Sequence, residues 1–454
     1  MTVVVAGRAL PVSPRAAYRA ARAEVGRTPR ALKAWYGILL VLMAFGAVGA
    51  LFTIAPGTEV FGTTPSFEWG ILISAYVFFA ITTSGLCLSS SLGTVFGIDM
   101  FMPLERRHAI LALLSLTTAF GIILLDLHYP VRLVFGAVFN PSLTSPMWWM
   151  GVFYAVYLVF LVVEVWSMFT GHPNIHRYAC LASSCTAVFA PATLGAVFGV
   201  MIARSYWFGL FTPIAMVVTA LVAGSALLGI VFFFVVRFRL AGFDRGRRLA
   251  FPAIRILMAV GLVGSLALLA RGLFVGWTSS DADLRDATMA LVNGPLAVPF
   301  WARLFGGLVI PLILIALPVT RTAAGTGIAA ALAFIGVVVD RLLFVSAGQI
   351  IPTTTVGGVV SDPYVTYAPS LVEISIVVAA FAFVAFVYTL AERYLDLREA
   401  EEHLGFHLPD IMGMTRQWVA ARRPALDLDP AEPGEPAEAA QPTQAPEASA
   451  RGDA

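Results

Sequence analysis

The residues with the clearest chemical potential lie in one short stretch of the chain. Asp126 and His128 are separated by one residue, and Tyr129, Pro130 and Arg132 follow them. The two acid–base groups share a face only if a helix ends there, and the residue before a proline is biased away from helical geometry. A carboxylate beside a histidine of near-neutral pKa can accept and release protons. The stretch therefore predicts a proton-transfer site, although a histidine at the end of a span is more commonly an interfacial anchor.

The composition places this stretch in a membrane protein. The chain has 454 residues, of which 59% are hydrophobic and 12% charged, with a mean hydropathy of +0.85. A soluble protein carries roughly 25% charged residues, so too little polar surface is available to cover a water-soluble particle. The net charge of +2 gives no support to a nucleic-acid partner. Membrane lipid is the expected surrounding.

The cysteine and histidine counts limit the redox groups that the chain can hold. Three cysteines cannot supply the four thiolates of an ordinary iron–sulfur cluster. Of six histidines, at most His128 lies near membrane depth, whereas a bis-histidine haem needs two. We therefore expect no haem, no iron–sulfur cluster and no bound metal in this chain.

Long apolar runs predict an all-α integral membrane protein with about ten transmembrane helices in a bundle. A span needs about 20 apolar residues to cross roughly 30 Å of hydrocarbon. No strand-like alternation appears, and the runs are too long for the strands of a barrel. The expected spans are 35–55, 70–97, 108–128, 147–169, 178–201, 210–236, 252–275, 295–317, 324–346 and 369–390.

Basic residues predict the orientation and the domain boundaries. Sixteen basic residues fall on the N-terminal side of the predicted spans and four on the other, so both termini are expected in the cytoplasm. Residues 1–33 are interpreted as a basic segment with a helix at the lipid headgroups, and 34–395 as the transmembrane domain. Residues 396–454 form a predicted cytoplasmic tail, disordered from about residue 425. A short solvated helix is expected over 391–404.

Further ionisable residues fall within the predicted spans, where charge is costly and is a candidate for function. Arg303, Asp340, Arg341 and Glu373 lie toward the outer ends of their spans, whereas Glu164 lies near an inner end. One interpretation is structural ion pairing, for example of Asp340 or Glu373 with Arg303 or Arg341. The other is a polar pocket that opens outward, with a proton path through Glu164 and the Asp340–Arg341 pair.

Two other patterns have simpler interpretations. Small residues around Ser84-Gly85 and Ser89-Ser90-Ser91 in the second span predict close helix packing. Trp148 and Trp149 open the fourth span and are typical of an interfacial belt, although they could also stack on a flat aromatic ligand.

Several of these motifs together resemble the NrfD/PsrC family, the membrane subunits of polysulfide reductase-type complexes. Each motif is weak alone, but their order and spacing are fairly specific, and the resemblance covers most of residues 35–395. The ten spans resemble the longer branch, which includes subunits of certain hydrogenases, sulfite-reduction-associated complexes and alternative complex III. The matching motifs are Asp126-Leu127-His128-Tyr129-Pro130-Val131-Arg132, Asn140-Pro141, Ser145-Pro146-Met147-Trp148-Trp149-Met150-Gly151, Ser84-Gly85, Ser90-Ser91-Leu92-Gly93, Val95-Phe96-Gly97, Phe300-Trp301 with Gly307 and Pro311, and Tyr367-Ala368-Pro369-Ser370 with Glu373.

The resemblance implies a function in respiration at the bacterial inner membrane. Such a subunit binds a quinone or quinol (menaquinone or ubiquinone) near the outer face and exchanges electrons with a ferredoxin-like iron–sulfur subunit. That partner connects to a catalytic redox subunit, which is a molybdopterin protein, a hydrogenase or a multihaem cytochrome. Carried over by position, Asp126 and His128 lie at the quinone ring, with Tyr129, Arg132 and Trp148 nearby.

The chain also departs from the family pattern. Many relatives have His-Gln-Ser-Ser-Leu-Gly in the fifth span, where this chain has Ala190-Pro191-Ala192-Thr193-Leu194-Gly195. A Glu is common after the Phe-Trp pair of the eighth span, where this chain has Arg303. Any proton route built on those groups is therefore in doubt.

A secondary transporter or ion carrier is the alternative hypothesis, because it would also bury charges among ten helices. Such carriers have broken helices at midplane and inverted repeats. The sequence has no convincing repeat, and its charges gather toward one face, so the quinone-reactive subunit is favoured. The terminal substrate, the quinone type and the direction of electron flow are not determined by the sequence.

Overall fold

The fold was analysed in a computed structural model of the chain. It describes residues 2–5, 8–11, 29–54, 60–98, 100–101, 105–127, 139, 141–237, 244–352, 364–395 and 397. These residues belong to one compact unit, Met1–Leu408. Ten helices are long and apolar enough to cross a membrane, which confirms the predicted all-α fold class.

The ten spans lie close to the predicted ranges. The short helix α10 (Ala282–Val292) lies between two of them and is not a span. The eighth span is composite, made of α11, the π-helix η3 and α12. The spans are α2 (Arg30–Ile54), α3 (Ile71–Thr94), α4 (Glu105–Asp126), α6 (Pro146–Thr170), α7 (Pro173–Gly199), α8 (Phe211–Arg237), α9 (Asp244–Thr278), α11 (Ala297–Ala302) with η3 (Arg303–Val309) and α12 (Ile310–Ala316), α13 (Ala323–Ala347), and α14 (Leu371–Tyr394).

Two small elements add to the helices. A 3₁₀ turn, η4 (Pro318–Thr320), precedes α13. An antiparallel hairpin, β1 (Thr2–Val5) with β2 (Arg8–Pro11), begins the chain and pairs Thr2 with Pro11. The sequence analysis did not predict this hairpin, although a β-branched run such as Thr2–Val5 favours a strand.

Capping residues fix several helix ends. Ser145 is the N-cap of α6 with Pro146 at the first helical position, and Gly171 closes the helix in the left-handed conformation at φ 74°. Thr322 caps α13 by accepting a hydrogen bond from the Gly325 amide at 3.0 Å. Ser370 and Glu373 form a capping box at the start of α14.

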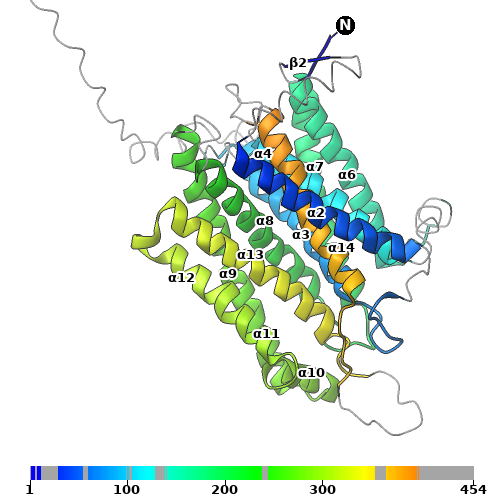
Figure 1. Ribbon diagram of the computed structural model, residues 1–454. Coiled ribbons are helices and arrows are strands. Elements are labelled where there is room, and N and C mark those ends of the chain that lie inside the picture. Colours follow the sequence, from blue (N-terminus) through cyan, green and yellow to red (C-terminus); the bar gives the residue numbers. More distant parts are fainter. Residues whose placement is uncertain are drawn as a thin grey trace, which may run out of the picture. The chain divides into compact units, whose positions relative to one another are not determined.

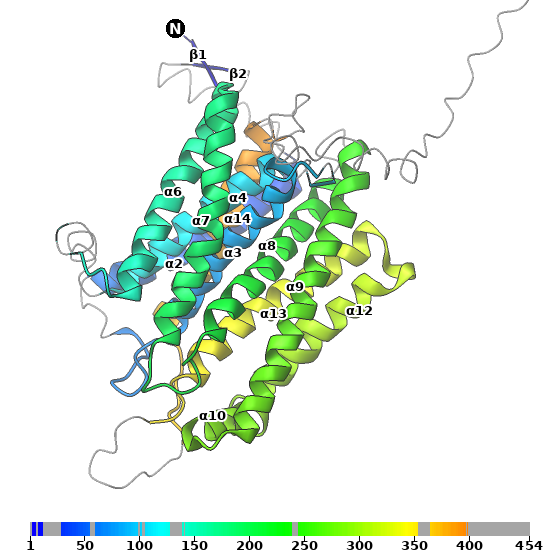
Figure 2. The same cartoon turned by 180° about the vertical axis from the view of Figure 1, so that it is seen from behind.

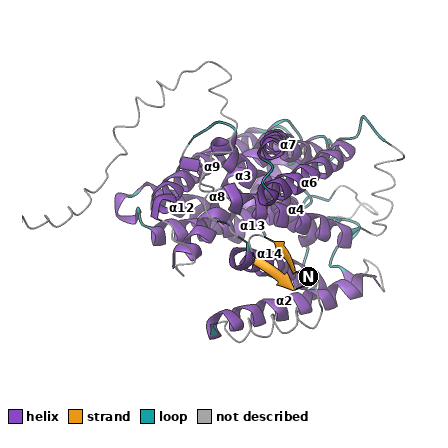
Figure 3. Cartoon of the chain, turned by 90° about the horizontal axis from the view of Figure 1, so that it is seen from above, coloured by secondary structure: helices purple, strands orange, loops and turns teal. Residues whose placement is uncertain are grey.

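The spans form two four-helix groups and a peripheral pair. Helices α3, α4, α6 and α7 make the first bundle, and α8, α9, the α11–η3–α12 span and α13 make the second. Helix α3 joins the two bundles by packing on α8 (Figures 1 and 2). The first and last spans, α2 and α14, pack on each other, and α14 separates α2 from the remaining helices (Figure 3).

Small residues allow the closest helix approaches. A Cβ on Gly85 of α3 would lie 1.7 Å from the carbonyl oxygen of Ala220 on α8, so the two backbones touch. The predicted close packing of the second span is therefore confirmed. Gly46 and Gly49 of α2 likewise face α14, where a Cβ on Gly46 would lie 2.1 Å from the Ala379 Cβ.

The two ends of the helices carry different features. We call the end that carries α10 the α10 end. Hydrogen bonds link the described parts of the loops at this end. The Val365 amide donates to the Ile350 carbonyl at 2.8 Å, and the Arg204 guanidinium donates to the Ile351 carbonyl at 3.0 Å. At the opposite end, Arg107 of α4 forms an ion pair with Glu392 of α14 at 2.7 Å.

Other expectations fall outside the described residues. The basic helix expected around Ser13-Pro14-Arg15 and the tail from residue 425 both lie there. Helix α14 ends at Tyr394, and nearly all the remainder of the expected helix over 391–404 is also outside them. The domain boundaries at residues 33 and 395 and the cytoplasmic orientation stay predictions.

Candidate functional site

Carboxyl and phenol groups from three parts of the chain gather at the α10 end of the first bundle. Asp126 is the last residue of α4 and is half-buried. It lies close enough to Glu373 of α14 and to Tyr367 in the preceding loop for the charges to interact. We call Asp126, Tyr367 and Glu373 the carboxylate cluster.

Glu373 is fixed by four hydrogen bonds. Its Oε1 accepts from the Tyr367 hydroxyl at 2.6 Å, and its Oε2 accepts from the amides of Gly62 and Ser370, both at 2.8 Å. The Glu373 amide donates in turn to the Ser370 hydroxyl at 3.2 Å. Among the described residues Glu373 therefore has no arginine partner, contrary to one of the pairings considered from the sequence, because its carboxylate is used in the capping box.

The Tyr367 hydroxyl is held in place by hydrogen bonds. Its oxygen also accepts a hydrogen bond from the Ile71 amide at 2.9 Å, which ties the loop to the start of α3. Burial raises the pKa of the Tyr367 phenol, and so do the neighbouring carboxylates of Glu373 and Asp126. The phenol consequently stays protonated at physiological pH, and its one proton is donated to Glu373 Oε1.

An aromatic group adjoins the same end. Trp69, just before α3, stacks on Trp207 with ring centroids 5.3 Å apart and packs edge-on against Phe198. Gln349 exchanges two hydrogen bonds with the Trp69 backbone, at 2.9 and 3.0 Å. The buried Trp207 donates its Nε1 proton to the Phe344 carbonyl at 2.8 Å, so its orientation is fixed. These rings join the two bundles rigidly beside the carboxylate cluster.

Part of the sequence-predicted site lies beyond the described residues. His128, Tyr129 and Arg132 all lie in the range 128–138, outside the residues that the structure describes. Trp148 is described, in the first turn of α6, half-buried and edge-on to Trp149 at 4.9 Å. The roles of these residues at a quinone stay predictions.

A second charged group lies in the second bundle. Asp340 of α13 accepts from Arg303 at 2.6 Å through Oδ1, and Oδ2 contacts its neighbour Arg341. The pairing of Arg303 with Asp340 is therefore present. Helix crossing explains it, because a Cβ on Gly307 would lie only 2.5 Å from the Gly336 Cα, and the charged residues sit one turn from that contact on antiparallel helices.

The charged residues considered for a pocket that opens outward do not all line one cavity. Arg303, Asp340 and Arg341 line a cavity of about 250 Å³ at the α10 end of the second bundle, but Asp126 and Glu373 do not line it. The cause is the separation of the chain into two bundles, which puts the carboxylate cluster on α4 and α14 and the arginines on η3 and α13.

Glu164 belongs to a third group, inside the first bundle toward the opposite end. Its Oε1 lies 3.3 Å from the His108 Nε2, and its Oε2 accepts from the Ser183 hydroxyl at 2.6 Å. The Ser90 hydroxyl lies 2.6 Å from the same His108 nitrogen. Glu164 and His108 are 1% and 0% exposed, so this contact between a carboxylate and an imidazole is shielded from water.

A connected row of polar groups continues from Glu164 in both directions. Toward the opposite end, His176 Nδ1 lies 3.3 Å from the Glu164 carbonyl, and His176 Nε2 lies 2.7 Å from the Glu105 carboxylate, which is 16% exposed. Toward the α10 end, the row continues through Ser183, Cys87 and Tyr157 to the Thr83 carbonyl. Beyond it, the hydroxyls of Ser84 and Tyr154 are buried and have no hydrogen-bond partner among the described residues. We call this set, with Glu105, His176, Glu164 and His108, the polar row.

One part of the polar row has the donor types of a metal site. Glu105, His176 and Cys180 each place a potential ligand atom within 4.8 Å of the others. Three donors are fewer than the four of a closed structural zinc site. Here His176 Nε2 contacts both the Glu105 carboxylate and, at 3.4 Å, the Cys180 thiol, so the atoms satisfy one another.

Sequence reasoning missed His108, His176 and Glu105. Each lies within a turn of the start of its helix, and of the histidines only His128 was expected near membrane depth. The available signal was spacing, because Glu105 and His108 are three apart on one helix, as are Glu164 and Ser167 on another. Arg107 was counted only for orientation, although it is buried against Glu392.

The fold and these groups define a multi-pass membrane protein with ionisable side chains at membrane depth. Comparison with known families gives its class. Residues 59–353 match the family described as "Polysulphide reductase, NrfD". The chain belongs to this family, which confirms the resemblance carried by the sequence motifs.

Two known proteins are similar to the chain at low sequence identity. The chain is similar to a protein of Mesobacillus selenatarsenatis named as a selenate reductase subunit, with 26% identity over 235 residues, which cover 43% of this chain and 55% of that protein. It is also similar to a protein of Halobacterium salinarum named as a putative dimethyl sulfoxide reductase membrane subunit. In that comparison the identity is 24% over 408 residues, which cover 81% of this chain and 92% of that protein. The chain thus spans little more than half the length of the first relative.

Proposed function

We propose that the chain is the quinone-reactive membrane subunit of a reductase complex. The family and the names of both relatives, each a subunit of a reductase, support the role of a membrane subunit. The observation that carries the quinone assignment is the carboxylate cluster, in which the half-buried Asp126 at the end of α4 interacts electrostatically with Glu373, the acceptor of the Tyr367 hydrogen bond.

The cluster suits the chemistry of a quinol. Oxidation of a quinol to a quinone releases two protons and two electrons, so the site needs a proton acceptor at one hydroxyl and a hydrogen bond at the other oxygen. In the proposal Asp126 accepts a proton, and Tyr367, which bonds Glu373 and the Ile71 amide, keeps the Glu373 carboxylate and the adjoining loop in place. His128 is proposed as a second proton carrier and Arg132 as its neighbour, from their positions in the family motif.

In this proposal the electrons pass to a partner subunit. The chain's own groups take part only in binding and proton transfer, and the electron acceptor is a ferredoxin-like iron–sulfur subunit docked at the α10 end. A catalytic redox subunit of the molybdopterin, hydrogenase or multihaem class completes the complex. The α10 end then faces the outside of a bacterial inner membrane, with both termini in the cytoplasm.

Proton translocation is the second part of the proposal. The polar row runs inside the first bundle from the partly exposed Glu105 through the buried Glu164–His108 pair toward the α10 end. Titratable and hydroxyl groups within hydrogen-bonding distance can pass a proton along a row. The Asp340–Arg341 pair lies in the other bundle, so the proposed route uses Glu164 without it.

The test uses the complex isolated through a tag on this chain. With a reduced quinol analogue as donor, reduction of the iron–sulfur centres of the co-purified partner is followed spectroscopically. Asp126→Asn should slow this reduction about 100-fold or more, as expected for loss of a general base. Asn174→Ala, an exposed change at the start of α7 and therefore at the opposite end, should leave the rate unchanged. An unchanged rate in Asp126→Asn removes this residue from the mechanism, and isolation of the chain without an iron–sulfur partner favours the transporter alternative.

A further inference from the structure

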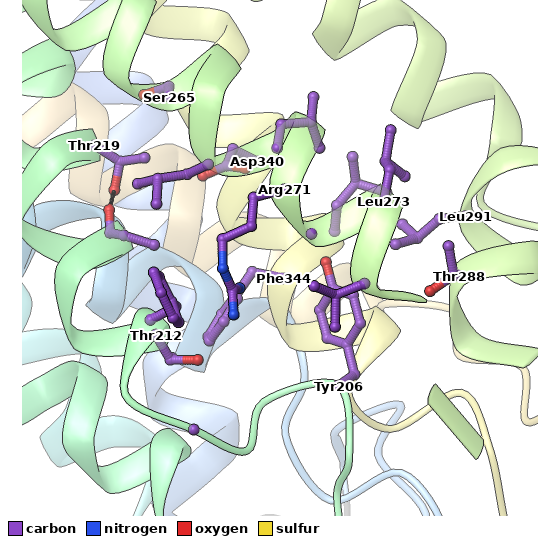
Figure 4. A pocket seen from close by; sticks show the side chains of 18 of the residues that line it. Tyr206, Thr212, Thr219, Ser265, Arg271, Leu273, Thr288, Leu291, Asp340 and Phe344 are labelled. Atoms are coloured by element: carbon purple, nitrogen blue, oxygen red, sulfur yellow. Dashed lines mark hydrogen bonds between the residues drawn. The ribbon is translucent and has the colours of Figure 1, made fainter. Parts of the chain in front are cut away.

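The cavity of the second bundle has a composition that the proposed function does not use. Its volume is about 250 Å³, and it lies at the α10 end among α8, α9, α10, η3 and α13. Charged groups line one part and apolar side chains, among them Phe300, Leu268 and Leu273, line the remainder. Figure 4 shows Arg271 and Tyr206 pointing into this space. A cavity of this size holds several water molecules or a small polar group, since a water occupies about 30 Å³.

The charges in the cavity do not balance. Three arginines line it, namely Arg271, Arg303 and Arg341, against the single carboxylate of Asp340. Each carboxylate oxygen of Asp340 is already used, Oδ1 by Arg303 and Oδ2 by Arg341. The lining therefore carries two positive charges more than negative ones, in a bilayer-embedded bundle where an unbalanced charge is costly.

Arg271 is the cation with the fewest polar contacts. Its guanidinium carbon lies 3.2 Å from the centre of the Phe211 ring, a cation–π contact that orients the group without neutralising it. Within the described part of the chain, no carboxylate forms an ion pair with Arg271. The guanidinium fork presents paired donors that match the oxygens of a phosphate group.

Arg303 contributes a second donor. Its Nε is buried and has no hydrogen-bond partner among the described residues. The residue begins the seven-residue π-helix Arg303–Val309, and such interruptions of regular helix are frequent at functional sites. Tyr206 also lines the cavity (Figure 4), and burial raises the pKa of its hydroxyl to about 12, so the phenol remains a donor.

We propose that this cavity binds a phosphate-type oxyanion. Arg271 and Arg303 are its charged ligands and Tyr206 a neutral donor, while the leucine and phenylalanine side chains adjoin any apolar portion. The phosphate group of an anionic phospholipid and a free inorganic phosphate share this chemistry. The site is separate from the carboxylate cluster, and its existence does not depend on the quinone assignment.

The test measures thermal unfolding of the full chain, purified in mild detergent with any accompanying subunits and washed free of lipid. One arm titrates inorganic phosphate against chloride at constant ionic strength. The other adds phosphatidylglycerol, against diacylglycerol with the same acyl chains. We expect one probe or both to raise the unfolding temperature, and Arg271→Gln to weaken the apparent affinity about tenfold or more, as for a lost charge-assisted hydrogen bond. Arg271 is exposed and its replacement leaves the buried ion pair intact.

Arg285→Gln is the matched control, because Arg285 is an exposed arginine of α10 that does not line the cavity. Its response should equal that of the unmodified chain. Stabilisation by phosphatidylglycerol alone identifies a lipid headgroup, stabilisation by inorganic phosphate alone a free anion, and a response to both the phosphate group itself. The proposal is overturned if neither probe exceeds its control, or if Arg271→Gln responds as strongly as the unmodified chain.

Discussion

Gly307 and Gly336 touch through their backbones, since a Cβ on Gly307 would lie 2.5 Å from the Gly336 Cα. This contact is where the π-helix η3 crosses α13. Four residues from it on each helix lie Arg303 and Asp340, whose side chains meet at 2.6 Å. The absence of two side chains at the crossing therefore permits the ion pair beside it.

The helix crossing gives the first prediction. Gly307→Ala should destabilise the protein by about 1–3 kcal/mol, the usual cost of overpacking, because the new methyl group meets backbone atoms that cannot move aside. The neighbouring Gly306 has nothing within 4 Å of an added Cβ, so Gly306→Ala should retain full stability. Thermal unfolding in detergent measures both variants. Equal unfolding temperatures for the two would show that the close contact is not maintained.

The buried ion pair gives the second prediction. Asp340→Asn leaves Arg303 and Arg341 without their carboxylate and should cost about 3–5 kcal/mol, the range for breaking a buried pair. Arg303→Gln should cost less, because Asp340 keeps Arg341. The double variant should lose less than the sum of the single losses. A strictly additive cycle in chemical or thermal unfolding would contradict the pairing.

Proton translocation is the subject of the third prediction. In liposomes containing the complex, quinol oxidation should change the internal pH reported by an enclosed dye. Glu164→Gln removes the carboxylate at the buried centre of the polar row and should reduce this change to the two protons that each oxidised quinol itself releases, while quinol oxidation continues. Glu68, which the polar row does not include, supplies the control Glu68→Gln. The same number of protons per quinol in Glu164→Gln as in the unmodified complex would exclude the proposed route.

The fourth prediction concerns alkaline pH. The pKa of Tyr367 is raised above 10.0, so the folded protein keeps a proton that the unfolded chain loses, and stability falls as pH rises above about 10. Tyr367→Phe should remove this contribution and make the loss of stability above pH 10 shallower. Below pH 9 the variant should be less stable by about 1–3 kcal/mol, because Glu373 and the Ile71 amide each lose a partner. Unfolding measured from pH 7 to 11 gives both quantities, and an unchanged slope would argue against the raised pKa.

The spans were predictable because bilayer thickness imposes a length that apolar runs reveal directly. Gly85 also indicated close packing, since small residues permit it. The π-helix beginning at Arg303 and the partition into two bundles were not predictable. Both depend on contacts between residues far apart in sequence, such as Gly307 with Gly336, which no local pattern encodes.

For the candidate sites, residue type was informative and pairing was not. An ion pair with arginine was one interpretation for Asp340 or Glu373, and of these two only Asp340 forms one among the described residues. Glu373 lies three positions after Ser370, a spacing that predicts a capping box. Its carboxylate forms this capping box, and among the described residues it forms no ion pair with an arginine. His108 escaped notice because its partner Glu164 lies on another helix.

The pairing of α2 with α14 has a consequence for biogenesis. Almost the whole transmembrane sequence separates these two helices. Gly46 and Gly49 of α2 nevertheless pack directly against α14, because they carry no side chain. Helix α2, which is synthesised before α14, therefore stays in the lipid without this partner until α14 has been inserted. The contact between α2 and α14, together with the Arg107–Glu392 ion pair, is therefore expected to form late in the assembly of the transmembrane domain.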